Sequence, residues 1–102
     1  MDLVGFLLAR MAEDAHTAAD LAAAQGAGGT AERLRADLAA KRKVVLACQA
    51  AAPDLRFLGA RPPGLADFPL PPKDAHQLAA LTLALLATPY ADHPDYDQRW
   101  RP

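Results

Sequence analysis

Three stretches of the chain carry apolar residues at helical spacing. They run from residue 2 to about 25, from 30 to 52, and from 74 to 88. In each stretch the apolar side chains recur every three or four residues, which places them on one face of an α-helix. No stretch alternates apolar and polar residues as a half-buried strand does. The pattern therefore predicts an all-α fold.

The first predicted helix has an apolar stripe and an opposite polar face. Asp2 is placed to cap its N-terminus. Phe6 falls outside the stripe, so we expect it to be half-exposed or covered by another segment. The stripe comprises Val4, Leu7, Leu8, Met11, Ala15, Ala18 and Ala22. The polar face, where we expect solvent, comprises Arg10, Glu13, Thr17 and Asp20.

The second predicted helix is capped by Thr30 and stopped by Pro53. Only a short glycine-rich turn separates it from the first helix, so we expect the two to be antiparallel neighbours. Lys41 lies inside its apolar stripe. In one arrangement, the aliphatic stem of Lys41 covers apolar surface while its ammonium group pairs with Asp37. In the other, the ammonium group is buried against Glu13, Asp14 or a tail carboxylate. The stripe comprises Leu34, Leu38, Val45, Cys48 and Ala52.

Residues 53–73 are rich in proline but also hold leucines and phenylalanines, so we expect an ordered, extended crossover. The third predicted helix follows, and Asp74 with Gln77 forms a capping box at its start. This helix is apolar nearly all round, which is typical of a central helix or a subunit interface. One face carries Leu78, Leu81, Thr82 and Leu85, and the far side carries Ala80, Ala84 and Ala87.

The tail, residues 89–102, holds both tyrosines and the single tryptophan. We expect Pro94 to begin a short helical turn, with Tyr96 and Trp100 facing the helices. The predicted fold is thus one domain, a three-helix bundle with a proline-rich crossover and a tail folded back. Tyr, Trp and Arg also carry much interface energy, which makes the tail a candidate interaction surface. That surface comprises Tyr90, Asp92, His93, Tyr96, Arg99, Trp100 and Arg101.

Charge is unevenly distributed although the net charge is only −1. Residues 30–61 hold seven bases and three acids, whereas residues 1–29 hold one base and four acids. The basic region suggests a nucleic-acid-binding alternative. The basic candidates are spread over more than half the helix circumference, which favours an ordinary solvated surface over a nucleic-acid site. These candidates are Arg33, Arg35, Arg42 and Lys43. Homodimerisation through the third helix or Phe6 is a further expectation.

Catalytic chemistry has weak support in this sequence. Cys48 lies on an apolar stripe, which favours a core position over a nucleophile. Asp92, His93, Asp95 and Asp97 could hold a cation, but turn chemistry explains them better. We therefore expect no cofactor, no metal and no catalytic residue. From the start of the sequence we expect no signal peptide, and no run of apolar residues is long enough to cross a membrane, so we expect a cytoplasmic protein.

The tail string from Pro89 to Tyr96, together with Trp100-Arg101-Pro102 at the end, resembles an actinobacterial family of small proteins of unknown function. The similarity extends to Asp2-Leu3-Val4, Glu13-Asp14 and the run from Ala40 to Lys43. Members of that family carry several cysteines in the middle, where this chain has prolines. The resemblance supplies no activity. The sequence best fits a non-catalytic protein-interaction module; a nucleic-acid-binding accessory protein is the alternative, and a small metal-dependent enzyme ranks last.

Overall fold

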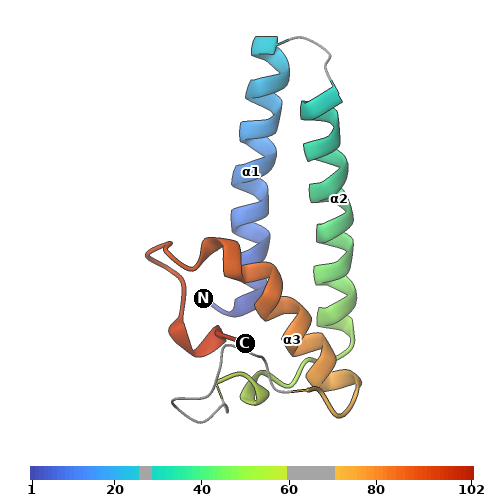
Figure 1. The fold of residues 1–102 in the computed structure, drawn as a ribbon, viewed down its shortest axis with the longest axis vertical. Coiled ribbons are helices and arrows are strands. Elements are labelled where there is room, and N and C mark those ends of the chain that lie inside the picture. Colours follow the sequence, from blue (N-terminus) through green and yellow to red (C-terminus); the bar gives the residue numbers. More distant parts are fainter. Residues whose placement is uncertain (26–28, 60–70) are drawn as a thin grey trace.

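A computed structural model of the 102-residue chain describes residues 1–25, 29–59 and 71–102 (Figure 1). Three α-helices pack against one another, and the described residues contain no strand, which confirms the all-α prediction. The helices are α1 (Leu3–Gln25), α2 (Gly29–Ala50) and α3 (Ala75–Ala87). Short 3₁₀ turns occupy Leu55–Phe57, Thr88–Tyr90 and Gln98–Trp100.

Side-chain caps fix the start of two helices. The Asp2 carboxylate accepts a hydrogen bond from the Gly5 backbone N–H at 2.7 Å, as predicted. Asp74 likewise accepts from the Gln77 N–H at 2.8 Å, but the Gln77 side chain accepts from the Lys73 N–H and not from that of Asp74. Thr30 is not the cap of α2, because that helix already begins at Gly29.

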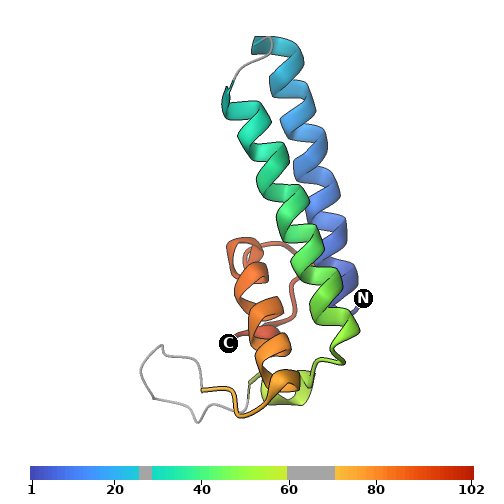
Figure 2. The same ribbon diagram turned by 90° about the vertical axis from the view of Figure 1, so that its right-hand side faces the viewer.

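The long helices α1 and α2 form an antiparallel hairpin, and α3 crosses only one end of it (Figures 1 and 2). That end holds the start of α1 and the end of α2. The molecule measures 48 × 27 × 24 Å, so the hairpin extends well beyond the third helix. Among the described residues, the other half of the hairpin therefore consists of two helices with no third layer against them.

The third helix faces the core with its alanine side, although the sequence pattern, apolar nearly all round, did not specify which side is buried. Ala80, Ala84 and Ala87 are fully buried, whereas Leu78 and Leu85 are 54% and 50% exposed. Alanines let two helix axes approach closely, because no side chain beyond Cβ separates them. Fully buried Leu83 then fills the space beside this contact. Leu81 is also buried, so Leu78 and Leu85 are the large side chains of α3 left on the outer surface.

The apolar stripe of α2 is only partly covered. Val45 is fully buried, Leu38 and Cys48 are half-buried, and Leu34 is 39% exposed. Ala52, the last predicted stripe residue, lies beyond the end of the helix and is exposed. This gradient follows from the position of α3, which packs only near the end of α2.

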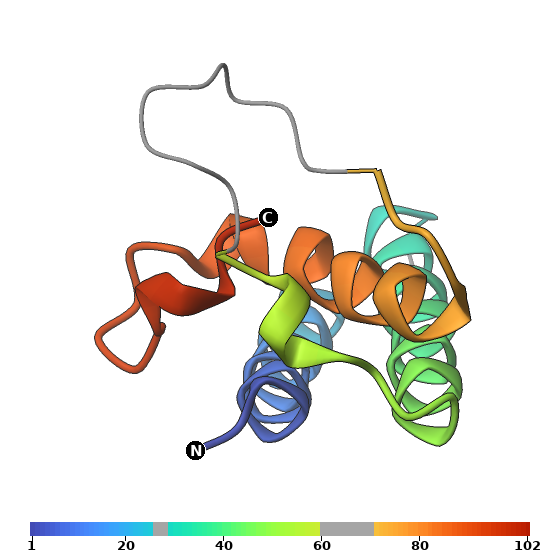
Figure 3. The ribbon, with the colours of Figure 1, turned by 90° about the horizontal axis from the view of Figure 1, so that it is seen from below.

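The predicted proline-rich crossover lies mainly in residues 60–70, outside the described residues. Its start is described: Asp54 caps the turn Leu55–Phe57, and Leu58 is buried. Figure 3 shows this turn beside α3. Gly59 has a φ of 74°, a backbone conformation that favours glycine, and an added Cβ would lie 3.4 Å from the Arg99 carbonyl oxygen.

The tail folds back beside the N-terminal end of α1 (Figures 1 and 3). Tyr96 and Trp100 are each only 8% exposed, which agrees with their predicted orientation towards the helices. Pro94, however, does not begin the final helical turn. Asp97 caps that turn, Gln98–Trp100, because its carboxylate accepts a hydrogen bond from the Arg99 N–H at 2.9 Å.

Candidate functional site

Phe6 is the centre of an aromatic cluster that attaches the tail to α1. Its side chain is fully buried. The rings of Tyr90, His93, Tyr96 and Trp100 have their centroids 6.3, 5.6, 5.9 and 5.1 Å from that of Phe6. The first three pairs are edge-to-face and the pair with Trp100 is tilted, and edge-to-face contacts at these distances add stabilisation beyond the burial of area. The tail thus covers Phe6, which is unavailable as a dimer contact in this structure.

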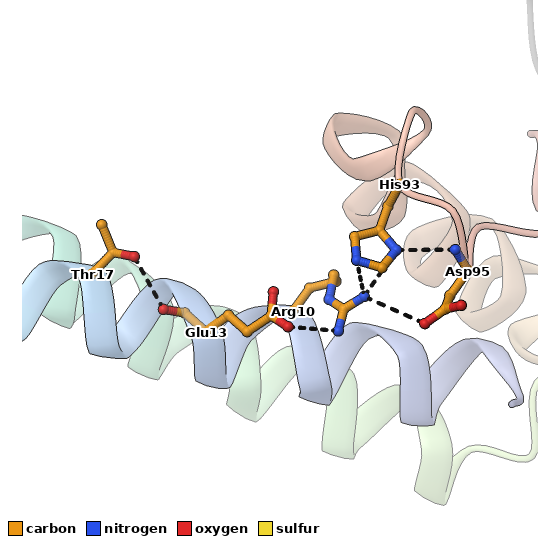
Figure 4. A network of polar contacts seen from close by, with 5 residues as sticks. All are labelled: Arg10, Glu13, Thr17, His93 and Asp95. Carbon is orange, nitrogen blue, oxygen red and sulfur yellow. Dashed lines mark hydrogen bonds and ion pairs between the residues drawn. The ribbon is translucent and has the colours of Figure 1, made fainter.

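Arg10 lies under the tail and is only 8% exposed, although the polar face of the first helix predicted solvent. Its guanidinium is 5.3 Å from the Phe6 ring centroid and donates to Glu13 at 2.8 Å (Figure 4). It also lies 3.9 Å from an Asp95 carboxylate oxygen and 3.0 Å from His93 Nδ1. The tail forms a second packing surface on this side of α1, which explains the burial.

The Arg10 guanidinium lies against the His93 ring and contacts both of its nitrogens. The Asp95 backbone N–H also donates to His93 Nδ1, at 3.0 Å (Figure 4). This arrangement orients the ring as a positioning group for the tail. It presents no free base to a substrate.

Asp14 is paired with the tail and not with Lys41. The Tyr90 hydroxyl donates to the Asp14 carboxylate at 2.5 Å. The pKa of Tyr90 is raised to about 12, mainly by burial of the hydroxyl and next by this hydrogen bond to the Asp14 carboxylate. Lys41 instead pairs with Asp37 one turn away at 2.8 Å, and both are partly exposed. The structure therefore agrees with the surface alternative for Lys41.

Replacing Tyr90 with phenylalanine should remove an alkaline instability. The folded state holds the Tyr90 proton up to about pH 12, whereas an unfolded tyrosine releases it near pH 10. Stability is therefore fully present below pH 10 and falls as the pH rises towards 12, by up to about 2 kcal/mol. Urea unfolding at pH 8, 10 and 11 measures this. Burial also raises the pKa of Tyr96, so the unaltered protein is the reference, and an unchanged pH slope in Tyr90→Phe would contradict the assignment.

The other tail residues do not converge on a cation. Asp97 forms an ion pair with Arg99 at 2.6 Å, and His93 faces Arg10. Asp92 and Arg101 are exposed. Within residues 1–25, 29–59 and 71–102, no three His, Cys, Asp or Glu side chains are placed to hold a metal ion. In the same residues, no helix is long and apolar enough to cross a membrane.

Cys48 is placed as a core residue. It is half-buried and packs against the core. Burial raises the pKa of its thiol, more than the hydrogen bond with Thr82 lowers it. Because the thiolate is the reactive form, a raised pKa makes this cysteine a poor nucleophile. The position of Cys48 therefore offers no support for a catalytic role.

An open groove runs along the hairpin on the side away from α3. This hairpin groove encloses about 340 Å³. Met11 is buried and Leu8 and Leu38 are half-buried, so these three form its base. Its remaining lining residues are exposed: Ala12, Ala15, Ala39, Arg35 and Arg42. The four basic residues predicted to bind nucleic acid thus lie on different surfaces of α2. Arg35 and Arg42 line the groove, whereas Arg33 and Lys43 are exposed outside it.

A second groove of about 350 Å³ lies on the α3 side of the hairpin. It is lined by Leu34, Leu86 and Tyr90, among others. Its charged groups are already engaged, because Asp37 pairs with Lys41 and Asp14 accepts from Tyr90. The hairpin groove differs in that its two charged residues are both basic and its lining holds no acid.

Sequence reasoning missed Arg10 and the hairpin groove as features of interest. The signal for Arg10 was present: it lies one turn after Phe6, on the face outside the stripe. For the groove, the pattern indicated a stripe but not that α3 would leave part of it uncovered.

Comparisons with known proteins give a family and no activity. The family model described as Family of unknown function (DUF6221) matches residues 1–102. No curated protein and no solved structure matches the chain significantly.

Proposed function

Since the chain belongs over its full length to this family of unknown function, we propose a function from its own surface: it is a non-catalytic protein-interaction module of the cytoplasm that binds a partner in the hairpin groove. One observation carries this proposal. The groove is an apolar depression between two long helices, and all of its lining residues belong to α1 and α2.

The tail supports this function indirectly. Its large rings, Tyr96 and Trp100, are packed on Phe6 and are not free to bind a partner. The tail instead holds one end of α1 in place, and α1 forms one wall of the groove. Recognition thus belongs to the helices, and the tail has the structural role.

Nucleic-acid binding remains the weaker alternative. At 100° per residue, Arg33 and Lys43 point well away from Arg35 and Arg42. Few phosphates are neutralised at once when bases are spread in this way, so affinity is low and falls with salt.

A site-specific photo-crosslinker tests the proposal in the native host. Ala39 lines the groove, and Ala40 is the next residue on the outer surface of α2; both are exposed. A crosslinker at position 39 should give a discrete adduct with another polypeptide, whereas position 40 should not. The variant Ala12→Glu, placed in the same groove, should abolish the adduct. The absence of an adduct at 39, or equal adducts at 39 and 40, would rule the groove out as the binding surface.

A further inference from the structure

We infer that the hairpin groove binds an amphipathic helix with two acidic side chains about two turns apart. This inference rests on the proposed function and specifies the chemistry of its partner. The base of the groove, Leu8, Met11 and Leu38, offers apolar contact between two helices. A third helix is the natural occupant of such a depression, as in other helix-in-groove complexes.

The charges of the groove select the partner. Arg35 and Arg42 are exposed, and neither forms an ion pair within the described part of the chain. They are seven residues apart, which places them on one side of α2 at about 10 Å along the helix axis. A partner helix lying along α2 has the same rise. It therefore meets both guanidinium groups with acids at positions i and i+7, and its apolar residues at i+3 and i+4 enter the groove.

A second copy of this chain fits the groove poorly. Packing groove against groove brings four arginines together, and the groove lining holds no acid to pair with them. The chain has acids at the required spacing, Glu13 and Asp20 on α1. On that face, however, they are separated by His16 and Thr17, which are polar and exposed. That helix would match the charges and leave the apolar base unfilled.

A membrane surface is also disfavoured. Binding to an anionic bilayer uses large apolar side chains that project from the helix surface. Here the exposed apolar lining is alanine, and Leu8, Met11 and Leu38 are recessed. The concave shape matches a convex helix.

Two labelled helical peptides test the inference with the purified full chain. One carries Glu at positions seven apart with Leu at the third and fourth positions between them, and the other carries Lys in place of Glu. Fluorescence anisotropy should show at least about tenfold tighter binding of the Glu peptide, since two charge pairs are exchanged for two repulsions. Arg35→Glu combined with Arg42→Glu should reverse the preference. Arg33→Glu combined with Lys43→Glu changes the net charge equally and should leave it intact.

Several results would overturn the inference. Equal binding of the two peptides would show that the groove does not recognise acidic side chains. A reversed peptide preference in the control variant Arg33→Glu, Lys43→Glu would show the same. In the cell, an adduct at position 39 that survives the Arg35→Glu, Arg42→Glu exchange would keep the interaction function and reject the acidic partner. Identification of the adduct as a second copy would do the same. The absence of the position-39 adduct in the unaltered protein would instead reject the interaction function itself.

Discussion

Replacing Phe6 with alanine is expected to destabilise the protein by about 3–5 kcal/mol, the range for a large aromatic side chain removed from a core. Phe6 is fully buried and contacts four aromatic side chains of the tail. Its loss removes the transfer free energy of the ring and leaves a cavity between α1 and the tail. The cation–π contact with buried Arg10 is lost as well.

Two readouts report on this variant. For a chain of this length the loss corresponds to a fall in Tm of roughly 15–30 °C. Trp100 is the single tryptophan and is buried, so its fluorescence should shift to the red as the tail loosens. Leu85→Ala is the control, because Leu85 is half exposed and its truncation should change the Tm by a few degrees at most. An unchanged Tm with unchanged Trp100 emission in Phe6→Ala would show that the aromatic cluster does not hold the tail.

The sequence was sufficient for the helices because each carries its own local signals. Three segments with helical spacing predicted α1, α2 and α3 to within two residues at each end. Asp2 and Asp74 act as caps as predicted, because a cap depends only on atoms within one turn. Thr30 was wrong as a cap, because α2 begins one residue earlier, at Gly29.

Long-range packing was not contained in these local patterns. Phe6 and Arg10 lie outside the α1 stripe, because that stripe records only the contact with α2. Their burial depends on the tail, more than 80 residues later in the chain. Likewise the pattern of α3 is apolar nearly all round and did not specify the buried side, which is the side of Ala80 and Ala84. Periodicity identifies a face with apolar residues but does not specify which segment covers it.

The same reasoning limits what could be predicted of the candidate site. The aromatic residues of the tail predicted its orientation correctly. The roles of its polar residues, however, depend on their partners on α1, which the sequence does not show. His93 and Asp95 were candidates for a cation, and the structure places both against the Arg10 guanidinium. A positive charge at this position opposes cation binding. The hairpin groove was not predicted, because it depends on where α3 ends relative to α2.

Removing the tail is expected to have the largest effect on stability. A chain ending at Thr88 lacks the rings of Tyr90, Tyr96 and Trp100, and it exposes Phe6 and Arg10. The lost burial exceeds that of Phe6→Ala, so the cost is above about 5 kcal/mol. Domains of this size have a total stability of only about 5–15 kcal/mol. The truncated chain should therefore have little or no cooperative thermal transition above 25 °C.

Circular dichroism during heating measures the transition, and a chain lacking only Arg101 and Pro102 is the control. Arg101 is exposed and Pro102 half-buried, so the control should lose no more than about 1 kcal/mol. Isolated α1 and α2 can retain partial helicity without a fixed core, so the sharpness of the transition decides and not the helical content. If the truncated chain melts at the same temperature as the full protein, the tail does not contribute to the stability of the fold. The tail would then be a free aromatic segment, and Tyr90, Tyr96 and Trp100 would again be candidates for contact with a partner.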